Sequence, residues 1–301
     1  MFRNGNSKQT LYCFMVVHPR EASLLRVHLD PGIGTLAACD AYDVFSNVTS
    51  FEPPIPGLGM TVAVQGSMDV PLVEPYMTAM NSEIFQAVWR QIFVEKRYQA
   101  YDWVIKLDAD TMFWASSVRD RITALNIDSK DNVLLHTKIK WTPGGVYHGL
   151  DGPLIAISRG AADAYGADPS HCENEVDISG KSEDWYLDEC LTLLGTKSVP
   201  EPGLLMSFVS DDVRACKNPK LPSAIHHFKE DWQLRKCYSL RESLERAKFG
   251  KVPWNRAGGS SQPRDPIVAR AAHDFSVVEG LIVVALCVAV ALFVIKRRKR
   301  R

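Results

Sequence analysis

Fifteen consecutive apolar residues, 281–295, precede a tail of six basic residues, 296–301, at the end of this 301-residue chain. With the flanking residues from 277 onward, the stretch is long enough for a helix that crosses a bilayer, which needs roughly 17–20 residues. The alternative is a helix buried in a globular core, but it would end in six cations that such a core does not accommodate. We therefore predict a transmembrane helix over residues 277–295, and the positive-inside rule predicts a cytoplasmic tail over 296–301.

Without its basic tail, the chain has a net negative charge. The chain has 35 basic and 35 acidic residues, and the tail holds six of the basic ones, so residues 1–295 carry six more acidic than basic side chains. A slightly acidic body argues against nucleic acid as the main partner. A composition of 46% apolar and 23% charged residues excludes a wholly disordered chain, a collagen and a small disulfide knot.

The predicted orientation places residues 1–276 in a lumen or outside the cell and requires an export signal. The apolar residues 11–17 are too short for one, so we expect either a leader that is missing from this sequence or a tail anchor on a cytosolic body. Six cysteines, an even number, lie outside the apolar segment, and Asn47 begins a glycosylation sequon. Both features favour a lumenal body, on a protein anchored in the Golgi or endoplasmic reticulum membrane. Six buried thiols are the alternative. Of the fifteen pairings, nearness in sequence suggests Cys172–Cys190 and Cys216–Cys237.

Short apolar runs alternate with helical patterns in the body, which predicts an α/β fold with a mostly parallel central sheet. One helix is expected after Asn81, which can cap it, because apolar residues from Ile84 to Phe93 recur at helical spacing. A second is expected to run to Gly195, with Ser182 as its cap. We expect a flexible N-terminus over residues 1–9, one domain over 10–249 and a stalk over 250–276. The strands are expected at residues 11–17, 44–46, 103–107, 133–136, 154–158 and 204–209.

Residues 101–113 (YDWVIKLDADTMF) contain the most informative motif of the chain, an apolar strand that runs directly into Asp108 and Asp110. Ligands of open α/β sheets bind beyond the carboxyl ends of strands. Two carboxylates there can share a divalent cation that bridges a diphosphate and makes it a better leaving group. The alternative is a surface turn in which the aspartates bond their own backbone.

The wider sequence resembles the β1,3-glycosyltransferase superfamily, which includes Fringe and the core-1 galactosyltransferases. Four blocks follow in the order of that family, although Ala109 stands where many members have a third aspartate. The blocks are residues 85–98 (FQAVWRQIFVEKRY) with 101–111 (YDWVIKLDADT), 152–159 (GPLIAISR), 183–187 (EDWYL) with Cys190, and 226–229 (HHFK).

The resemblance implies a GT-A-like nucleotide-diphospho-sugar transferase fold, a UDP-sugar donor and a divalent ion, Mn²⁺ or Mg²⁺. It implies that Asp110 ligates the metal, that Asp108 contacts the ribose or the metal, and that His226 completes the metal shell, with His227 as the neighbouring alternative. Lys229 would offset phosphate charge. A polar surface pair is the alternative for both histidines.

Glu183 and Asp184 fall in the first turn of a predicted helix, where the helix dipole favours anions and explains them without any catalytic role. The resemblance instead implies that Asp184 is the general base of an inverting transfer, with Glu183 supporting it. Trp141, Tyr147 and His148 flank glycines and could stack on an acceptor sugar, although core packing is the commoner role of a tryptophan.

We expect a membrane-anchored, metal-dependent glycosyltransferase that moves a hexose-type sugar from a UDP-sugar to a hydroxyl of a glycan or glycoprotein. One alternative is a catalytically inactive relative that serves as a membrane-bound glycan-binding or chaperone-like subunit. A cytosolic, tail-anchored enzyme of another phosphate chemistry is the third.

Overall fold

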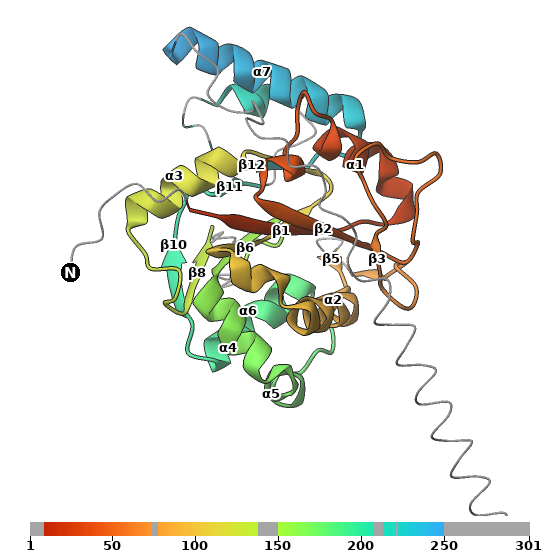
Figure 1. The fold of residues 1–301 in the computed structure, drawn as a ribbon, viewed down its shortest axis with the longest axis vertical. Helices are drawn as coiled ribbons and strands as arrows, with labels where there is room; N and C mark the ends of the chain where they lie inside the picture. Colours follow the sequence, from red (N-terminus) through yellow and green to blue (C-terminus); the bar gives the residue numbers. More distant parts are fainter. Residues whose placement is uncertain are drawn as a thin grey trace, which may run out of the picture. The chain divides into compact units, whose positions relative to one another are not determined.

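A seven-stranded sheet forms the centre of the part of the chain that the computed structural model describes, which is residues 9–73, 78–137, 150–207, 213–218, 220 and 222–249 (Figure 1). All of these residues belong to one unit, residues 1–258. Across the sheet, the strands are β10 (Lys197–Pro200), β8 (Val133–His136), β9 (Leu154–Ser158), β6 (Trp103–Asp108), β1 (Leu11–Val16), β2 (Ala41–Ser46) and β3 (Val62–Ala63).

The sheet is mostly parallel, as the sequence predicts. Four neighbouring pairs run parallel, and only β9 runs antiparallel to its neighbours β6 and β8. The carboxyl ends of β1 and β6 therefore lie side by side, with Val16 opposite Asp108. Because β9 runs the other way, its first residues, next to Leu107, reach the same edge of the sheet.

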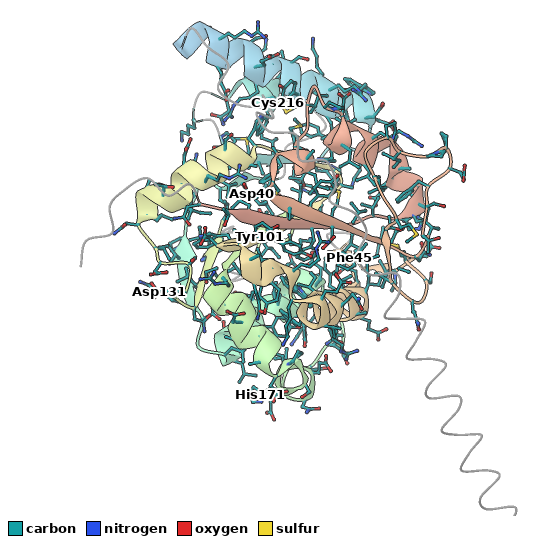
Figure 2. All side chains as sticks on the ribbon, viewed as in Figure 1. Asp40, Phe45, Tyr101, Asp131, His171 and Cys216 are labelled. Carbon is teal, nitrogen blue, oxygen red and sulfur yellow. A yellow bond between two sulfur atoms is a disulfide. The ribbon has the colours of Figure 1, made fainter. Side chains whose placement is uncertain are left out.

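Helices cover both faces of the sheet, and side chains fill the space between the layers (Figures 1 and 2). Successive residues of a strand point to opposite faces, so Cys13 and Met15 of β1 pack in one core cluster and Tyr12 and Phe14 in the other. The helices of the first cluster are α1 (Ala22–Leu29), α3 (Ala115–Leu125) and α7 (Asp231–Phe249), and those of the second are α2 (Ser82–Glu95), α4 (Arg159–Ala167), α5 (Pro169–Glu175) and α6 (Glu183–Leu193).

The two predicted helices are confirmed as α2 and α6. The apolar stripe of α2 is buried at Phe85, Val88, Trp89, Ile92 and Phe93 against the second cluster. Burial of this stripe explains why a sequence with helical spacing forms a stable helix here.

A second, three-stranded sheet brings the end of the domain next to the acidic motif. In it, β12 (Ala224–His226) pairs antiparallel with β7 (Thr111–Phe113) and parallel with β11 (Leu205–Met206). The predicted strand over 204–209 is confirmed at Leu205–Met206, and its residues 208 and 209 lie outside the described residues. The remaining short elements are β4 (Leu72–Val73), β5 (Thr78–Ala79), η1 (Pro19–Glu21), η2 (Leu36–Ala38), η3 (Arg97–Ala100) and η4 (Val213–Lys217).

Three disulfides join the six cysteines of the body. Cys172–Cys190, which links α5 to α6, and Cys216–Cys237, which links η4 to α7, confirm the two predicted pairs. The third disulfide, Cys13–Cys39, ties β1 to the segment after η2.

Among the described helices, none combines the length and the apolar character that a membrane crossing requires. The predicted transmembrane helix 277–295, the tail 296–301 and the stalk 250–276 lie outside the described residues. The same holds for Trp141, Tyr147 and His148, and for residues 1–8 of the predicted flexible N-terminus.

Candidate active site

The acidic motif forms the turn between β6 and β7. β6 ends at Asp108 and β7 begins at Thr111, so Asp108 and Asp110 lie at the carboxyl end of a central strand. Asp110 is buried, whereas Asp108 is about one-third exposed. The sequence predicts carboxylates at this edge of the sheet, and the structure places them there.

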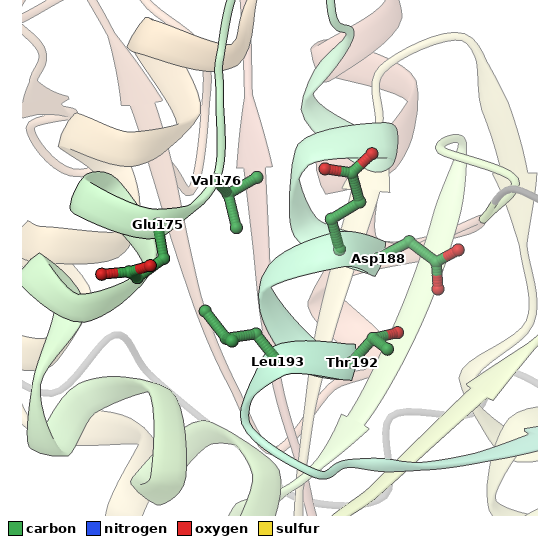
Figure 3. Close-up of a pocket in the computed structure, with 6 residues that line it drawn as sticks. Glu175, Val176, Asp188, Thr192 and Leu193 are labelled. Carbon is green, nitrogen blue, oxygen red and sulfur yellow. The ribbon is translucent and has the colours of Figure 1, made fainter.

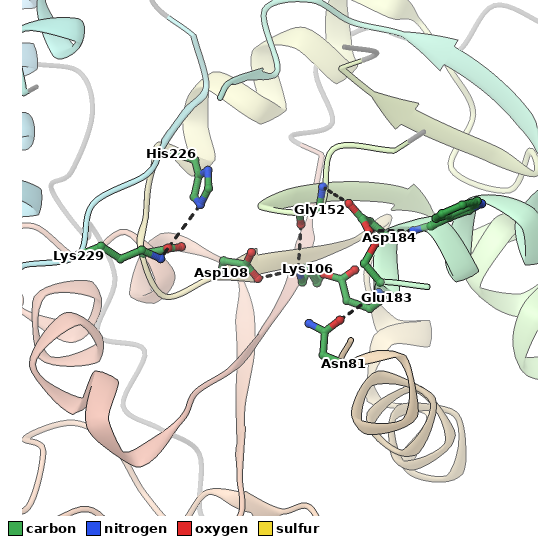
Figure 4. Close-up of polar contacts among 11 residues, drawn as sticks. Asn81, Lys106, Asp108, Gly152, Glu183, Asp184, His226 and Lys229 are labelled. Atoms are coloured by element: carbon green, nitrogen blue, oxygen red, sulfur yellow. Dashed lines mark hydrogen bonds and ion pairs between the residues drawn. The ribbon is translucent and has the colours of Figure 1, made fainter. Parts of the chain in front are cut away.

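His226 and Lys229 both contact Asp110 (Figure 4). His226 Nε2 lies 3.4 Å from Asp110 Oδ2, and the Lys229 ammonium donates to the same oxygen. Pairing of β12 with β7 sets His226 opposite Thr111 and so beside the motif. Burial acts to raise the pKa of Asp110, but His226 and Lys229 outweigh it and hold that pKa well below its usual range. The rings of His226 and His227 pack edge to face, with their centres 4.9 Å apart.

Lys106 joins the acidic motif to the start of α6. Its ammonium lies 2.6 Å from Asp108 Oδ1, donates to the Gly152 carbonyl over 2.8 Å and pairs with Glu183 (Figure 4). Burial acts to lower the pKa of Lys106, but the carboxylates of Asp108 and Glu183 outweigh it and raise that pKa. Burial acts to raise the pKa of Glu183, and the charge of Lys106 opposes that shift. Lys106 therefore stays a cation at neutral pH, between two acidic side chains.

Asp184 is held by the backbone at the start of α6. Its Oδ2 accepts from the Gly152 N–H over 3.1 Å, and its Oδ1 accepts from the Trp185 N–H over 2.9 Å and from the Ser182 hydroxyl. Asp184 and Lys106 thus bond to the same glycine, Asp184 at its N–H and Lys106 at its carbonyl.

The residues expected to cap the two helices bond elsewhere. Asn81 precedes α2 but makes no side-chain cap; its Oδ1 instead accepts from the Glu183 N–H over 3.0 Å. Ser182 precedes α6, and its hydroxyl donates to Asp184 rather than capping the helix. Both helix starts are confirmed, but the side-chain caps were wrong, because polar groups of the site compete for the same side chains.

Asp151, for which the sequence predicts no role, lies three residues before Leu154, where β9 begins, and is only 7% exposed. Its Oδ2 has no hydrogen-bond partner among the described residues. Burial raises the pKa of Asp151 to about 7, with His226 opposing the shift and Asp184 and Asp108 adding to it. No sequence signal marks this residue, because its burial depends on the neighbouring strand and helix.

His28 of α1 was also missed, and it supports the acidic motif from the other face of the sheet. It is fully buried, and its Nε2 lies 2.8 Å from the Ala109 carbonyl, while Nδ1 bonds the Thr35 hydroxyl. A carbonyl only accepts, so the neutral ring carries its hydrogen on Nε2 and accepts at Nδ1. Burial lowers the pKa of His28 to about 4. His28 thereby fixes the peptide between Asp108 and Asp110.

These side chains are of the types that bind a divalent ion, but they are not arranged as a metal site. Two carboxylates and an imidazole are the ligands that an intermediate ion such as Mn²⁺ accepts, and Asp151 adds a buried oxygen without a described partner. Among the described side chains, no three histidines, cysteines or carboxylates are grouped as metal ligands. Lys106 pairs with Asp108, and Lys229 pairs with Asp110.

A hollow of about 310 Å³ lies elsewhere, along α6 beyond its first turn (Figure 3). None of the predicted site residues lines it, so we do not assign it to the site. Its walls are Glu175, Val176, Asp188, Glu189, Thr192 and Leu193.

No protein-family model matches this sequence, and no curated protein is significantly similar to it. The assignment to the β1,3-glycosyltransferase superfamily therefore stays a prediction.

Solved structures of similar fold include a glycosyltransferase involved in the glycosylation of the major capsid of PBCV-1. It is 10% identical with a TM-score of 0.46, over 77% of this chain and 98% of that one. The galactosyltransferase LgtC, in complex with donor and acceptor sugar analogues, is 11% identical with a TM-score of 0.41, over 77% of this chain and 96% of that one. The apo-form glycosyltransferase GlyE of Streptococcus pneumoniae TIGR4 is 10% identical with a TM-score of 0.40, over 80% of this chain and 64% of that one. At these values the likeness says nothing about the substrate of this chain.

Proposed function

We propose that this protein is a glycosyltransferase that moves a hexose-type sugar from a UDP-sugar to a hydroxyl of a glycan or glycoprotein. One observation carries the proposal. At the carboxyl end of β6, Asp110 contacts His226 and Lys229. Lys106 joins Asp108 to Glu183, and Gly152 joins Lys106 to Asp184. A charged diphosphate and a sugar hydroxyl need these two kinds of group at one place.

The donor half of the site consists of Asp108, Asp110, His226 and Lys229. The two carboxylates and the imidazole would hold Mn²⁺ or Mg²⁺, which when bound offsets the charge of the leaving diphosphate. Lys229 contacts Asp110 and is more than half exposed, so its ammonium can turn to a phosphate oxygen and stabilise it as a point charge.

The acceptor half consists of Asp184 and Glu183. In an inverting transfer, the acceptor oxygen forms a bond to the anomeric carbon while the bond from that carbon to the diphosphate oxygen breaks. The electron pair leaves with UDP, and the hydroxyl proton passes to a carboxylate. Asp184 is our proposed base, and Glu183, held by Lys106, supports it.

Membrane anchoring by residues 277–295 and a lumenal body in the Golgi or endoplasmic reticulum belong to the same proposal. The three disulfides support it, because disulfides persist in oxidising compartments.

A second candidate is a catalytically inactive relative that binds glycans or nucleotides without turnover. It is favoured by the pairing of both acidic residues with lysines, Asp108 with Lys106 and Asp110 with Lys229.

The test is hydrolysis of UDP-galactose, UDP-glucose and UDP-N-acetylglucosamine by the full chain in detergent, with and without Mn²⁺. We expect turnover with at least one donor that needs Mn²⁺ and falls at least about 100-fold in Asp110→Ala, since metal and diphosphate positioning supply several kcal/mol. Asp177→Ala, which removes an exposed carboxylate, is the matched control. Equal turnover in Asp110→Ala and the control refutes the site, and UDP binding without turnover of any donor favours the second candidate.

A further inference from the structure

Lys106 occupies a position where the sheet predicts an apolar residue. β6 lies between β1 and β9, and Lys106 points to the same face as Val104, toward α2 and α6. The side chain is 1% exposed, and its ammonium sits 4.7 Å from the centre of the Phe85 ring. Strands buried on both faces are normally continuous apolar runs, so a lysine here requires an explanation.

Stability does not provide that explanation. A buried ion pair loses the hydration of both charges, and apolar residues of similar volume often give an equally stable or more stable protein. The reason for Lys106 is therefore to be found in what its ammonium holds in place.

Three acceptors from three separate elements surround the ammonium (Figure 4). They are the Asp108 carboxylate at the end of β6, the Gly152 carbonyl before β9 and the Glu183 carboxylate at the start of α6. An ammonium has three N–H donors, so these contacts use its full capacity and fix the three elements relative to one another.

Gly152 links Lys106 to Asp184. The Gly152 residue accepts from Lys106 at its carbonyl and donates from its N–H to Asp184 Oδ2, 3.1 Å away. A Cβ at this position would lie 3.0 Å from Asp184 Oδ2 and 3.2 Å from Glu183 Oε1. A glycine is therefore the residue that lets the two carboxylates approach the backbone at this position.

We infer that Lys106 is a positioning residue that, through Gly152, sets the placement of the acceptor-side carboxylates Glu183 and Asp184 relative to Asp108 on the donor side. This inference rests on the proposed function. It assigns no contact between Lys106 and the substrate; Lys106 acts through the groups that it holds.

The first test variant is Lys106→Met/Glu183→Gln, which removes the ammonium without leaving a charged carboxylate buried beside an apolar side chain. Its matched control, Lys130→Met/Glu175→Gln, makes the same two charge changes at exposed positions. The second test variant, Gly152→Ala, keeps every charge and adds a Cβ that crowds the Asp184 and Glu183 carboxylates.

The measurements are kcat and KM for hydrolysis of the UDP-sugar that the full chain turns over, with near-ultraviolet circular dichroism to confirm folding. We expect kcat to fall about 100-fold in Lys106→Met/Glu183→Gln, the loss that a misplaced reacting group causes, and KM for the UDP-sugar to rise because Asp108 is released. In Gly152→Ala we expect kcat to fall at least about tenfold with KM unchanged, because only the acceptor half is disturbed.

A merely structural lysine would lower the melting temperature but leave kcat per folded molecule at the level of the control. That result in either folded test variant overturns the inference while leaving the glycosyltransferase proposal intact. If the double variant does not fold, Gly152→Ala decides alone, and unchanged kcat there overturns the inference. A wild-type chain that turns over no UDP-sugar overturns both proposals, so the two failures are distinguishable.

Discussion

Replacing His28 by glutamine should remove a large part of the acid sensitivity of this protein. The buried ring donates from Nε2 to the Ala109 carbonyl and accepts at Nδ1 from Thr35, so both nitrogens are satisfied only in the neutral form. A glutamine amide can repeat the donation to Ala109, and it does not titrate. His28→Gln therefore removes the titration while keeping the support of the acidic motif.

The sign and the size of the change in unfolding free energy follow from the pKa of His28. Burial lowers the pKa of His28 from 6.5 to about 4, so the unfolded chain binds a proton that the folded chain rejects. The stability that neutral His28 contributes is complete above pH 6.5 and is lost as the pH falls toward 4. Between pH 7.5 and 4.5 this linkage costs the wild type about 2.5 kcal/mol of unfolding free energy.

The assay is urea unfolding at pH 7.5 and 4.5 for the wild type, His28→Gln and His171→Gln, which removes an exposed imidazole as the control. The groups with raised pKa, Glu183 and Asp151, are common to all three chains and cancel in the comparison. We expect the loss between the two pH values to be about 2.5 kcal/mol smaller in His28→Gln than in the other two. An equal loss in all three chains would refute the assignment of a neutral, buried His28.

Two other perturbations have defined outcomes. Because burial raises the pKa of Asp151 to about 7, its contribution to stability is present below pH 3.8 and lost as the pH rises through 7. In EDTA, Asp151→Asn should therefore be more stable than the wild type at pH 8, by up to about 4 kcal/mol, and should lose this advantage at pH 4. Thermal unfolding that shows a less stable variant at pH 8 would contradict this prediction. Cys172→Ala/Cys190→Ala opens a loop with a sequence separation of 18 and should cost about 3 kcal/mol in urea unfolding, whereas a loss under about 1 kcal/mol would contradict the stabilising role of this disulfide.

The local sequence was enough to predict the helices and strands whose hydrophobic pattern lies within one segment of the chain. The apolar stripe of α2 repeats at helical spacing, and residues 103–107 form an apolar run that ends at Asp108, so both elements and the position of the acidic motif could be predicted. Placement of His226 and Lys229 at the site came from the resemblance to a family and not from any pattern in the chain. The third disulfide, Cys13–Cys39, had no such signal, since nearness in sequence favoured only the other two pairs.

Tertiary structure alone decided how the site is held together. Lys229 and Asp110 are 119 residues apart in the chain, and Lys106 and Glu183 are 77 apart, so strand pairing and helix packing create these contacts. The same packing removes Asp151 and His28 from water and thereby shifts their pKa values in opposite directions. The sequence by itself determined which groups are available at the end of β6. Only burial and long-range pairing decided which of them are paired or neutral, because those properties depend on distances that no local pattern contains.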